Sequence, residues 1–502
     1  MGADGELRLT GGGDIDIRIG GVMNPDIAAR TLSSTGNSRL DLQGVLANLR
    51  GSTSLLAGSV GGIDLRYGLS QPQQDPAETR AYELYRSSLG AASGGLVLVP
   101  GDAGMRLAAR GDLVVGGAGD PGRITVPNTT PFTGANGSQY AGGGSTWFSL
   151  WTANTAIDLF SAGGNLTPST QISDFHGISR VNQLINANTS STDGRFIYPS
   201  ILRAVAAQGS LYLGASATGN TGQLSALAPY SLLLAPSASG ELQLLAGDSI
   251  YAGGYSVQRS GTDSQNLASI WNPAFAGYGL STTTPVISNG NVGGRSVPLG
   301  STPLFYFGAD TAGILPGGLE PSRFYAMRGD IVGLSSGEVI QFSSYAITAG
   351  NLAGQTWYEG AGAVRMIAGR DIVASGTQLG SSRSAPPWVG NTPGNDGSQS
   401  IGNLFIHYNA NDISLVQAGR DILYSSFNVA GPGTLEISAG RNVLMEDRAV
   451  INSLGAILPG DSRQGASVVL QAGAAGADYN AFLARYLDPV SYTHLTLPTI
   501  SS

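Results

Sequence analysis

The sequence predicts an all-β fold, a parallel β-helix in which successive turns of the chain stack into a solenoid. The first observation is a repeated unit: an alternating apolar segment, then Ala-Gly or Arg-Gly, then Asp or Asn, then a second apolar segment. The clearest copies lie at 368–372, 418–422 and 439–443. The second observation is their spacing. Asp421 and Asn442 are 21 residues apart, and one turn of a β-helix needs about 20 residues.

The residue types in this unit suit a strand, a tight turn and a second strand. Alternation places Leu435 and Ile437 on the inner side of a strand and Glu436 on its outer side. Glycine adopts the backbone angles of the turn, and an Asp or Asn side chain bonds nearby backbone N–H groups. We therefore expect polar side chains to stack along the axis; an antiparallel sandwich with Gly-Asp turns is the alternative. The predicted turn residues are Gly13, Asp14, Gly164, Asn165, Gly247, Asp248, Gly369, Asp371, Gly419, Asp421, Gly440 and Asn442.

Larger spacings between units are interpreted through the same turn length. Asp330 and Asp371 are 41 residues apart, which predicts two turns of the solenoid between them. Asp248 and Asp330 are 82 residues apart, which predicts unmarked turns or inserted loops. Solenoids accept such insertions because neighbouring turns still stack around them.

The chain is predicted to form one solenoid over residues 1–489, with short helices on its flank. Asp75, Pro76 and Glu78 have the pattern of a helix start, so residues 71–90 are predicted to be a helical insertion. A second helix is predicted over 478–488. Segments rich in Asn, Thr, Gly, Ser and Pro are predicted to be loop insertions, at 119–155, 166–200, 252–320 and 381–400.

Composition excludes several classes of function. A net charge of −8 and a pI of about 4.9 argue against a nucleic-acid partner. There is no cysteine for a disulfide or a thiolate metal site, and no cofactor is predicted. No segment has the roughly 18 apolar residues of a membrane-spanning helix, and Met1 leads into a strand rather than a signal peptide. We therefore expect either a cytosolic protein or an internal piece of a larger one.

The last residues favour the second of these. Residues 490–499 read VSYTHLTLPT, which resembles a sequencing-library adapter translated in frame. Residues 490–502 are therefore expected to be an artefact that contributes nothing to the fold, and the gene is expected to continue beyond Pro489.

The repeated units and the segment Asp478–Pro489 resemble the filamentous haemagglutinin family. The resemblance implies a right-handed parallel β-helix that acts as a secreted or surface-displayed adhesin of a Gram-negative bacterium. It also implies export through an outer-membrane transporter of a two-partner secretion system. The family's secretion domain carries Asn-Pro-Asn motifs. This chain has only Asn24-Pro25-Asp26 and Asn272-Pro273-Ala274, so that domain is expected upstream.

Two Arg-Gly-Asp triplets are the candidate receptor-binding residues, because some adhesins of this family are thought to engage host receptors through that triplet. They are Arg110-Gly111-Asp112 and Arg328-Gly329-Asp330. Both lie where other units carry Gly-Arg-Asp or Ala-Gly-Asp, so repeat geometry alone also explains them. A host receptor or a carbohydrate is the expected partner.

The sequence favours a non-enzymatic protein. A polysaccharide-degrading β-helix, the alternative, needs two or three carboxylates in one groove, and no such cluster stands out. Asp14 and Asp16 share a strand face but lack calcium-motif spacing. His176 and His407 have no nearby nucleophile signature. The five tryptophans are expected to pack loops on the solenoid or to contact a partner: Trp147, Trp151, Trp271, Trp357 and Trp388.

Overall fold

The structure is a computed structural model of the chain. It describes residues 12–24, 45–61, 67–69, 84–86, 96–119, 146–147, 151–152, 154–169, 198–213, 232–234, 240–251, 254–257, 274–275, 291–292, 295–296, 320–336, 339–343, 356–359, 362–377, 398–402, 404–445, 449–455 and 463–473. Every secondary-structure element in these ranges is a strand, and 21 strands belong to one hydrogen-bonded sheet.

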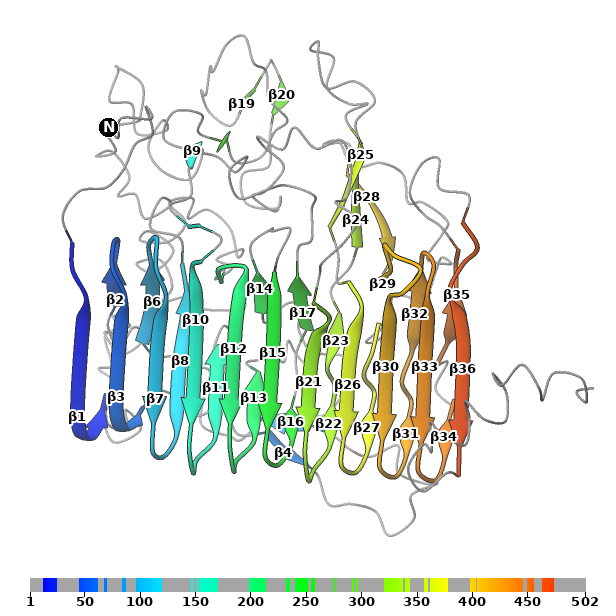
Figure 1. Ribbon diagram of the computed structural model, residues 1–502, viewed down its shortest axis with the longest axis horizontal. Coiled ribbons are helices and arrows are strands. Elements are labelled where there is room, and N and C mark those ends of the chain that lie inside the picture. The colour runs from blue at the N-terminus through cyan, green and yellow to red at the C-terminus, as the bar shows by residue number, and fades with distance from the viewer. Residues whose placement is uncertain are drawn as a thin grey trace, which may run out of the picture.

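The first face of the solenoid is a row of eleven parallel strands, which forms the front layer in Figure 1. Each strand belongs to one turn of the chain, which we call a rung. The strands are β1 (Ile15–Met23), β3 (Thr53–Val60), β7 (Met105–Ala109), β10 (Ala156–Ser161), β12 (Ile201–Ala206), β15 (Glu241–Ala246), β21 (Ser322–Ala326), β26 (Val364–Ala368), β30 (Ile413–Ala418), β33 (Thr434–Ala439) and β36 (Ser467–Ala472).

The chain then turns a corner into a second face of shorter parallel strands. These are β8 (Leu113–Ala118), β11 (Leu166–Ser169), β13 (Leu211–Leu213), β16 (Ile250–Tyr251), β22 (Ile331–Val332), β27 (Ile372–Val373), β31 (Ile422–Leu423) and β34 (Val443–Leu444). They pair in this order. Parallel pairing on both faces confirms the predicted solenoid and excludes the antiparallel sandwich.

Further parallel strands lie beyond these two faces. They are β2 (Val45–Asn48) with β6 (Leu96–Pro100), then β14 (Leu232–Leu234), β17 (Gly254–Val257) and β23 (Ser335–Ser336), and then β29 (Phe405–Ile406), β32 (Phe427–Ala430) and β35 (Ile451–Ser453). Antiparallel pairs are β4 (Tyr67–Leu69) with β5 (Leu84–Arg86), β9 (Thr146–Trp147) with β18 (Ala274–Phe275), and β19 (Asn291–Val292) with β20 (Arg295–Ser296). In a three-stranded sheet, β24 (Val339–Ser343) lies between β25 (Thr356–Glu359) and β28 (Ser398–Gly402).

The core is built from columns of inward side chains, one residue per rung. The central column of the first face is apolar and almost fully buried up to the last rung: Leu55, Leu107, Leu159, Ala204, Leu244, Phe324, Met366, Val416 and Ile437. The last inward position before the corner is alanine in nearly every rung. This column supplies the Ala of the Ala-Gly pattern.

The structure corrects the predicted turn length. Ile331 pairs directly with Ile372, so the 41-residue spacing is one rung rather than two. Ile250 pairs directly with Ile331, so the 82-residue spacing is also one rung. Extra chain leaves the solenoid between strands, and the strands on either side still stack. The 21-residue rung that ends at Asn442 is the shortest step along the corner.

Two secondary-structure predictions also need correction. Residues 84–86 form strand β5, so the helix predicted over 71–90 is wrong there; the rest of that segment lies outside the described residues. The predicted loops contain strands: β9 in 119–155, β11 in 166–200, β17 to β20 in 252–320, and the start of β28 in 381–400. Residues 478–488 and 490–502 lie outside the described residues. Within the described ranges, no helix is long and apolar enough to cross a membrane.

Candidate functional site

The corner between the first and second faces carries a continuous column of polar side chains, which we call the corner column. It consists of Asp112, Asn165, Ser210, Ser249, Asp330, Asp371, Asp421 and Asn442, one residue from each of eight successive rungs. Each member directly precedes a strand of the second face. The stacking of parallel strands therefore brings together residues that are far apart in the sequence.

Glycine is required at this corner because neighbouring rungs approach closely. A Cβ atom at Gly369 would lie 2.2 Å from the carbonyl oxygen of Met327 in the preceding rung. A Cβ atom at Gly419 would lie 2.2 Å from the carbonyl oxygen of Gly369, and one at Gly440 would lie 2.0 Å from that of Gly419. These approaches give a physical reason for the repeated Ala-Gly dipeptide.

The first segment of the column, Asp112 to Ser249, is linked by backbone-to-side-chain hydrogen bonds. Asn165 N–H donates to Asp112 Oδ1 at 2.7 Å. Ser210 N–H donates to Asn165 Oδ1 at 2.9 Å, and Ser249 N–H donates to Ser210 Oγ at 3.3 Å. The column continues across the longest insertion, because Asp330 N–H donates to Ser249 Oγ at 3.0 Å although the two residues are 81 positions apart.

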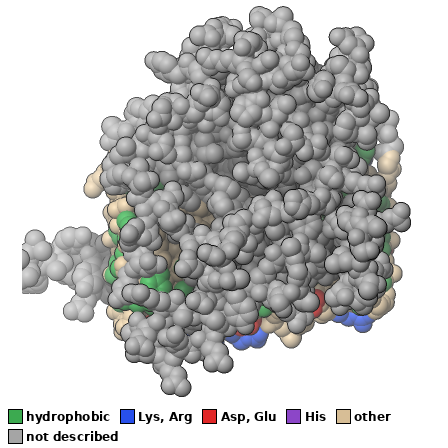
Figure 2. Space-filling model, turned by 180° about the vertical axis from the view of Figure 1, so that it is seen from behind, with side chains coloured by type: hydrophobic (Ala, Val, Ile, Leu, Met, Phe, Trp, Pro, Cys, Tyr) green, Lys and Arg blue, Asp and Glu red, His purple; other side chains and the backbone are tan. Residues whose placement is uncertain are grey.

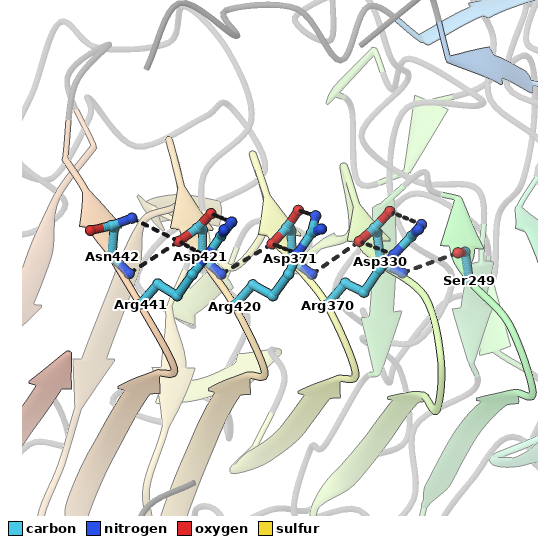
Figure 3. Close-up of polar contacts among 8 residues, drawn as sticks. All are labelled: Ser249, Asp330, Arg370, Asp371, Arg420, Asp421, Arg441 and Asn442. Atoms are coloured by element: carbon cyan, nitrogen blue, oxygen red, sulfur yellow. Dashed lines mark hydrogen bonds and ion pairs between the residues drawn. The ribbon is translucent and has the colours of Figure 1, made fainter. Parts of the chain in front are cut away.

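The second segment, Asp330 to Asn442, uses carboxylates as the acceptors (Figure 3). Asp371 N–H donates to Asp330 Oδ1, and Asp421 N–H donates to Asp371 Oδ1, each at 3.0 Å. Asn442 donates to Asp421 Oδ1 through both its backbone N–H, at 3.1 Å, and its side-chain amide, at 3.0 Å. The three rungs of Asp371, Asp421 and Asn442 are therefore each bonded to the carboxylate of the rung before.

Arginine side chains neutralise these three carboxylates. Arg370 donates from Nε to Asp330 Oδ1 at 3.2 Å and from Nη2 to Asp330 Oδ2 at 2.6 Å. Arg420 and Arg441 make the same two-pronged contact with the carboxylate of the preceding rung, and Figure 3 shows the three pairs stacked in register. Two parallel bonds between guanidinium and carboxylate form the stronger class of ion pair.

The ion pairs have a buried side and a solvent side. Asp330, Asp371 and Asp421 are each 2 % exposed, whereas the arginines are 41–49 % exposed. Burial disfavours the charged form of Arg370, but the hydrogen bond and charge of Asp330 outweigh it and raise the pKa of this guanidinium. The arginine and acidic side chains visible along the lower edge of Figure 2 lie on the side where this corner runs.

The structure places the predicted turn residues at two different corners. Asn165, Asp371, Asp421 and Asn442 belong to the corner column. Asp248 is one position early, because Ser249 occupies the column and Asp248 instead accepts a bond from the Ser210 hydroxyl at 3.2 Å.

Gly13 and Asp14 precede β1, and Asp14 lies beside Ser52 at the opposite end of the first face. The Ser52 hydroxyl and backbone N–H donate to Asp14 and lower the pKa of its carboxyl. Asp16 is paired with Arg18 at 3.0 Å. The described residues contain no group of three or more His, Cys, Asp or Glu that is arranged to hold a metal ion.

Both Arg-Gly-Asp triplets lie at the corner between the first and second faces. Arg110 donates to the carbonyl oxygen of Gly20 at 3.1 Å, and Arg328 donates to that of Gln208 at 2.8 Å. Both oxygens of the Asp330 carboxylate accept bonds inside the protein. This geometry disfavours recognition of the second triplet, because a receptor would have to break the ion pair with Arg370 to reach Asp330.

His407 has a serine partner that sequence reasoning missed. His407 Nδ1–H donates to the carbonyl oxygen of Pro432 at 2.8 Å, which leaves Nε2 to accept from the Ser414 hydroxyl at 2.7 Å. His407 is 1 % exposed and Ser414 is fully buried, so the pair lacks the access that a nucleophile needs. Burial lowers the pKa of His407.

Trp151 is the one tryptophan whose side chain the structure describes. It is buried, and its Nε1–H donates to the carbonyl oxygen of Pro100 at 2.9 Å, as expected for a residue that packs beside the solenoid. Trp147 and Trp357 lie in β9 and β25. Trp271, Trp388 and His176 lie outside the described residues.

The outer side of the first face carries an apolar column that is partly exposed, with two exposed and five half-buried members. We call it the outer stripe, and its members pair rung to rung: Leu56, Ala108, Phe160, Val205, Leu245, Tyr325 and Ile367. Leu56 is 51 % exposed and Phe160 is 38 % exposed. By contrast, the outward Val332 and Val373 of the second face are shielded from solvent.

Arginines lie in the outward column next to the outer stripe, on the same strands of the first face. Arg203 forms ion pairs with Asp158 and Glu241, at 3.1 and 2.7 Å. Arg106 and Arg365 occupy the same outward column as Arg203 and are exposed. Among the interactions of the described residues, no ion pair involves either of them.

No family model, no curated protein and no solved structure matches this chain.

Proposed function

We propose that the protein is a non-enzymatic surface adhesin of the filamentous haemagglutinin type, in which the solenoid presents a long binding face. The observation that carries the proposal is the outer stripe, an apolar column on seven successive rungs in which Leu56 and Phe160 are exposed and the other five members are half-buried. Monomeric proteins rarely leave large contiguous apolar patches exposed, and such patches mark interaction sites. Arg106 and Arg365 add charged donors at its edge.

The arrangement of the described carboxylates supports a binding role over a catalytic one. A polysaccharide-degrading enzyme needs carboxylates that are free to reach the substrate. In the corner column, Asp330, Asp371 and Asp421 are buried and each accepts bonds from an arginine and a backbone N–H. Each of the three carboxylates is only 2 % exposed, so they stabilise the stack of rungs and are not free to reach a substrate.

The proposal extends to export and location. We place the protein at the surface of a Gram-negative cell or outside it, delivered by an outer-membrane two-partner-secretion transporter. It would attach to a host receptor or a carbohydrate on host cells or other bacteria. The repeated Ala-Gly-Arg-Asp-Ile units support this part through their resemblance to the family.

Beads coated with the chain test the proposal by their adhesion to cultured epithelial cells. The double variant Phe160→Glu/Tyr325→Glu places two charges in the outer stripe. It should reduce adhesion by about tenfold or more, because a few large side chains supply most of the binding free energy at an interface. Ser438→Glu is the matched control, since Ser438 continues the same outward column on β33 where the column is polar. Equal adhesion of all three proteins would contradict the proposal. Release of reducing sugar from polysaccharides by the purified chain would favour the enzymatic alternative.

A further inference from the structure

A buried histidine lies between the first face and the turn that leads into the next rung. His407 follows β29, and its ring contacts Ser414 on β30 and Pro432 in the turn 431–433 between β32 and β33. The ring is almost completely enclosed, because His407 is 1 % exposed. Neither the corner column nor the outer stripe involves this residue.

The ring completes a hydrogen-bonded chain across three successive rungs. Val364 N–H on β26 donates to Ser414 Oγ at 3.2 Å, and the Ser414 hydroxyl donates to His407 Nε2 at 2.7 Å. His407 Nδ1–H donates to the carbonyl oxygen of Pro432 at 2.8 Å. A carbonyl oxygen only accepts, so this arrangement requires the neutral ring with its proton on Nδ1.

A second proton on the ring would break this chain at Nε2. The protonated Nε2 cannot accept from the Ser414 hydroxyl, and among the described residues that hydroxyl has no other acceptor. The described residues also place no carboxylate in a hydrogen bond with the ring. Burying a charge without a bonded counter-charge costs free energy, so the closed arrangement disfavours the imidazolium.

Two charged side chains lie beside the histidine, and together they leave most of that cost in place. Asp412 attracts a proton to His407, but its Oδ2 accepts from the backbone N–H groups of Tyr408 and Asn409, at 2.7 and 2.9 Å. Burial outweighs this attraction and lowers the pKa of the ring. Arg463 donates to the carbonyl oxygen of Tyr408 at 2.8 Å, which brings a second positive charge near the ring.

The turn 431–433 is the element whose movement would let water reach the ring. It contains Gly431 and Gly433, whose φ angles are 89° and 94°, and a Cβ atom at Gly433 would lie 3.0 Å from His407 Nδ1. Two backbone hydrogen bonds, at Gly431 and Gly433, join this turn to the following rung. Strand β30, on the other side of the ring, is paired with both β26 and β33. The turn is therefore the easier of the two to displace.

We propose that His407 is an acid-sensitive latch, in which the neutral ring holds the turn 431–433 closed against β30 and uptake of a proton opens the turn. In the open form water reaches the ring, which then titrates near its ordinary pKa of 6.5. Protons bind the open form more tightly than the closed form, so acid shifts the population toward the open turn.

Hydrogen–deuterium exchange of the folded chain, followed by mass spectrometry, tests the latch. Peptides that cover 427–440 should exchange about tenfold faster at about pH 5.5 than at about pH 7.5, after correction for the intrinsic pH dependence of exchange. The factor follows because the open form gains close to one proton over this range. Peptides that cover 201–213, in rungs that contain no part of the latch, should show no such change.

His407→Gln should abolish the acid response, because an amide can make both bonds of the neutral ring and takes up no proton. Asp412→Asn is the matched control, since it removes the other titrating group beside the ring and should leave the response in place. His407→Asn replaces His407→Gln if circular dichroism shows that the latter does not fold. Four results would overturn the proposal: no acid response in the unmodified chain, a response that persists in the histidine variant, a response that is lost in Asp412→Asn, or an equal response at 201–213.

Discussion

The two segments of the corner column differ in the groups that accept the backbone N–H of the following rung. Between Asp112 and Ser249, each rung's N–H is accepted by a neighbouring side chain without an arginine partner. Between Asp330 and Asn442, the acceptors are buried carboxylates, and each carries a two-pronged arginine. A serine hydroxyl buried at a corner needs only a hydrogen bond, whereas a buried carboxylate also needs a counter-charge.

The charged segment is not simply the stronger of the two. Transferring an ion pair out of water costs free energy that the attraction between the ions must offset. Each link of the charged segment therefore depends on both partners being present. The neutral segment, Asn165 to Ser249, has less to lose from any single substitution. The first and last of the three predictions below test this difference.

Removing one arginine should give the largest effect. In Arg420→Ala the carboxylate of Asp371 stays buried and still accepts from the N–H of Asp421, but it loses its guanidinium counter-charge. We expect a loss of about 3 kcal/mol in the free energy of unfolding, the lower end for breaking a buried pair, because solvent reaches the arginine side. Urea unfolding followed by circular dichroism measures it.

Two companion variants show whether the uncompensated charge causes that loss. Arg420→Lys keeps the charge but not the two-pronged contact, so it should lose about half as much. Adding Asp371→Asn to Arg420→Ala removes the buried charge and should recover most of the stability. A double variant no more stable than Arg420→Ala alone would show that packing of the arginine stem matters more than charge.

A smaller effect is expected in mild acid, and it arises from the buried His407. Burial lowers the pKa of His407 below its ordinary 6.5, so in acid the unfolded chain takes up this proton before the folded chain does. The contribution is fully present above pH 6.5 and is lost as pH falls below that value, by at most about 1.4 kcal/mol at a pH one unit lower. Ordinary carboxyl groups, with pKa values near 4, stay ionised in this window.

Unfolding free energies of the unmodified chain and of His407→Gln, each measured above and below this window, test that sign. The difference between the two conditions should shrink in the variant. The idea fails if both proteins lose the same stability, or if the unmodified chain gains stability in acid.

The neutral segment should show the smallest effect. Ser210→Ala removes two hydrogen bonds, the one that the Ser249 N–H donates at 3.3 Å and the one that the Ser210 hydroxyl donates to Asp248 at 3.2 Å. We expect a loss of about 1 kcal/mol, because both bonds are long and each contributes about 0.5 kcal/mol, the low end for a hydrogen bond. A loss as large as that of Arg420→Ala, in the same urea experiment, would remove the distinction between the two segments.

Sequence reasoning reached the solenoid because strand alternation and Gly-Asp turns are local signals. Asp371, Asp421 and Asn442 sit inside clear Ala-Gly-Arg units, and the structure places them together at one corner. Ser249 follows an Ala-Gly pair at the same offset as Asp371, but the neighbouring Asp248 matched the pattern and was predicted in its place. Ser210 has no Ala-Gly pair at that offset, so no local pattern marks it.

The carboxylate partner of each arginine and the length of each rung could not be predicted from the sequence, because neither is a local feature. Arg420 pairs with Asp371, 49 positions earlier, and only the length of the intervening insertion decides which carboxylate it meets. Gly13 and Asp14 carry the right residues but belong to another corner. The segment 71–90 has a helix-start pattern, yet Leu84–Arg86 pair with Tyr67–Leu69 as a strand, which shows tertiary context overriding local propensity.

The unequal rung lengths also bear on the order of folding. Closing a loop costs entropy that grows with its length, so joining Ser249 to Asp330 across 81 residues costs about 1 kcal/mol more than joining Asp421 to Asn442 across 21. We expect the rungs around Asp421 to fold first and to form the nucleus on which the other rungs then fold. Assembly would then spread from the C-terminal part of the described solenoid toward β1, and the junction at Ser249 would be its slowest step.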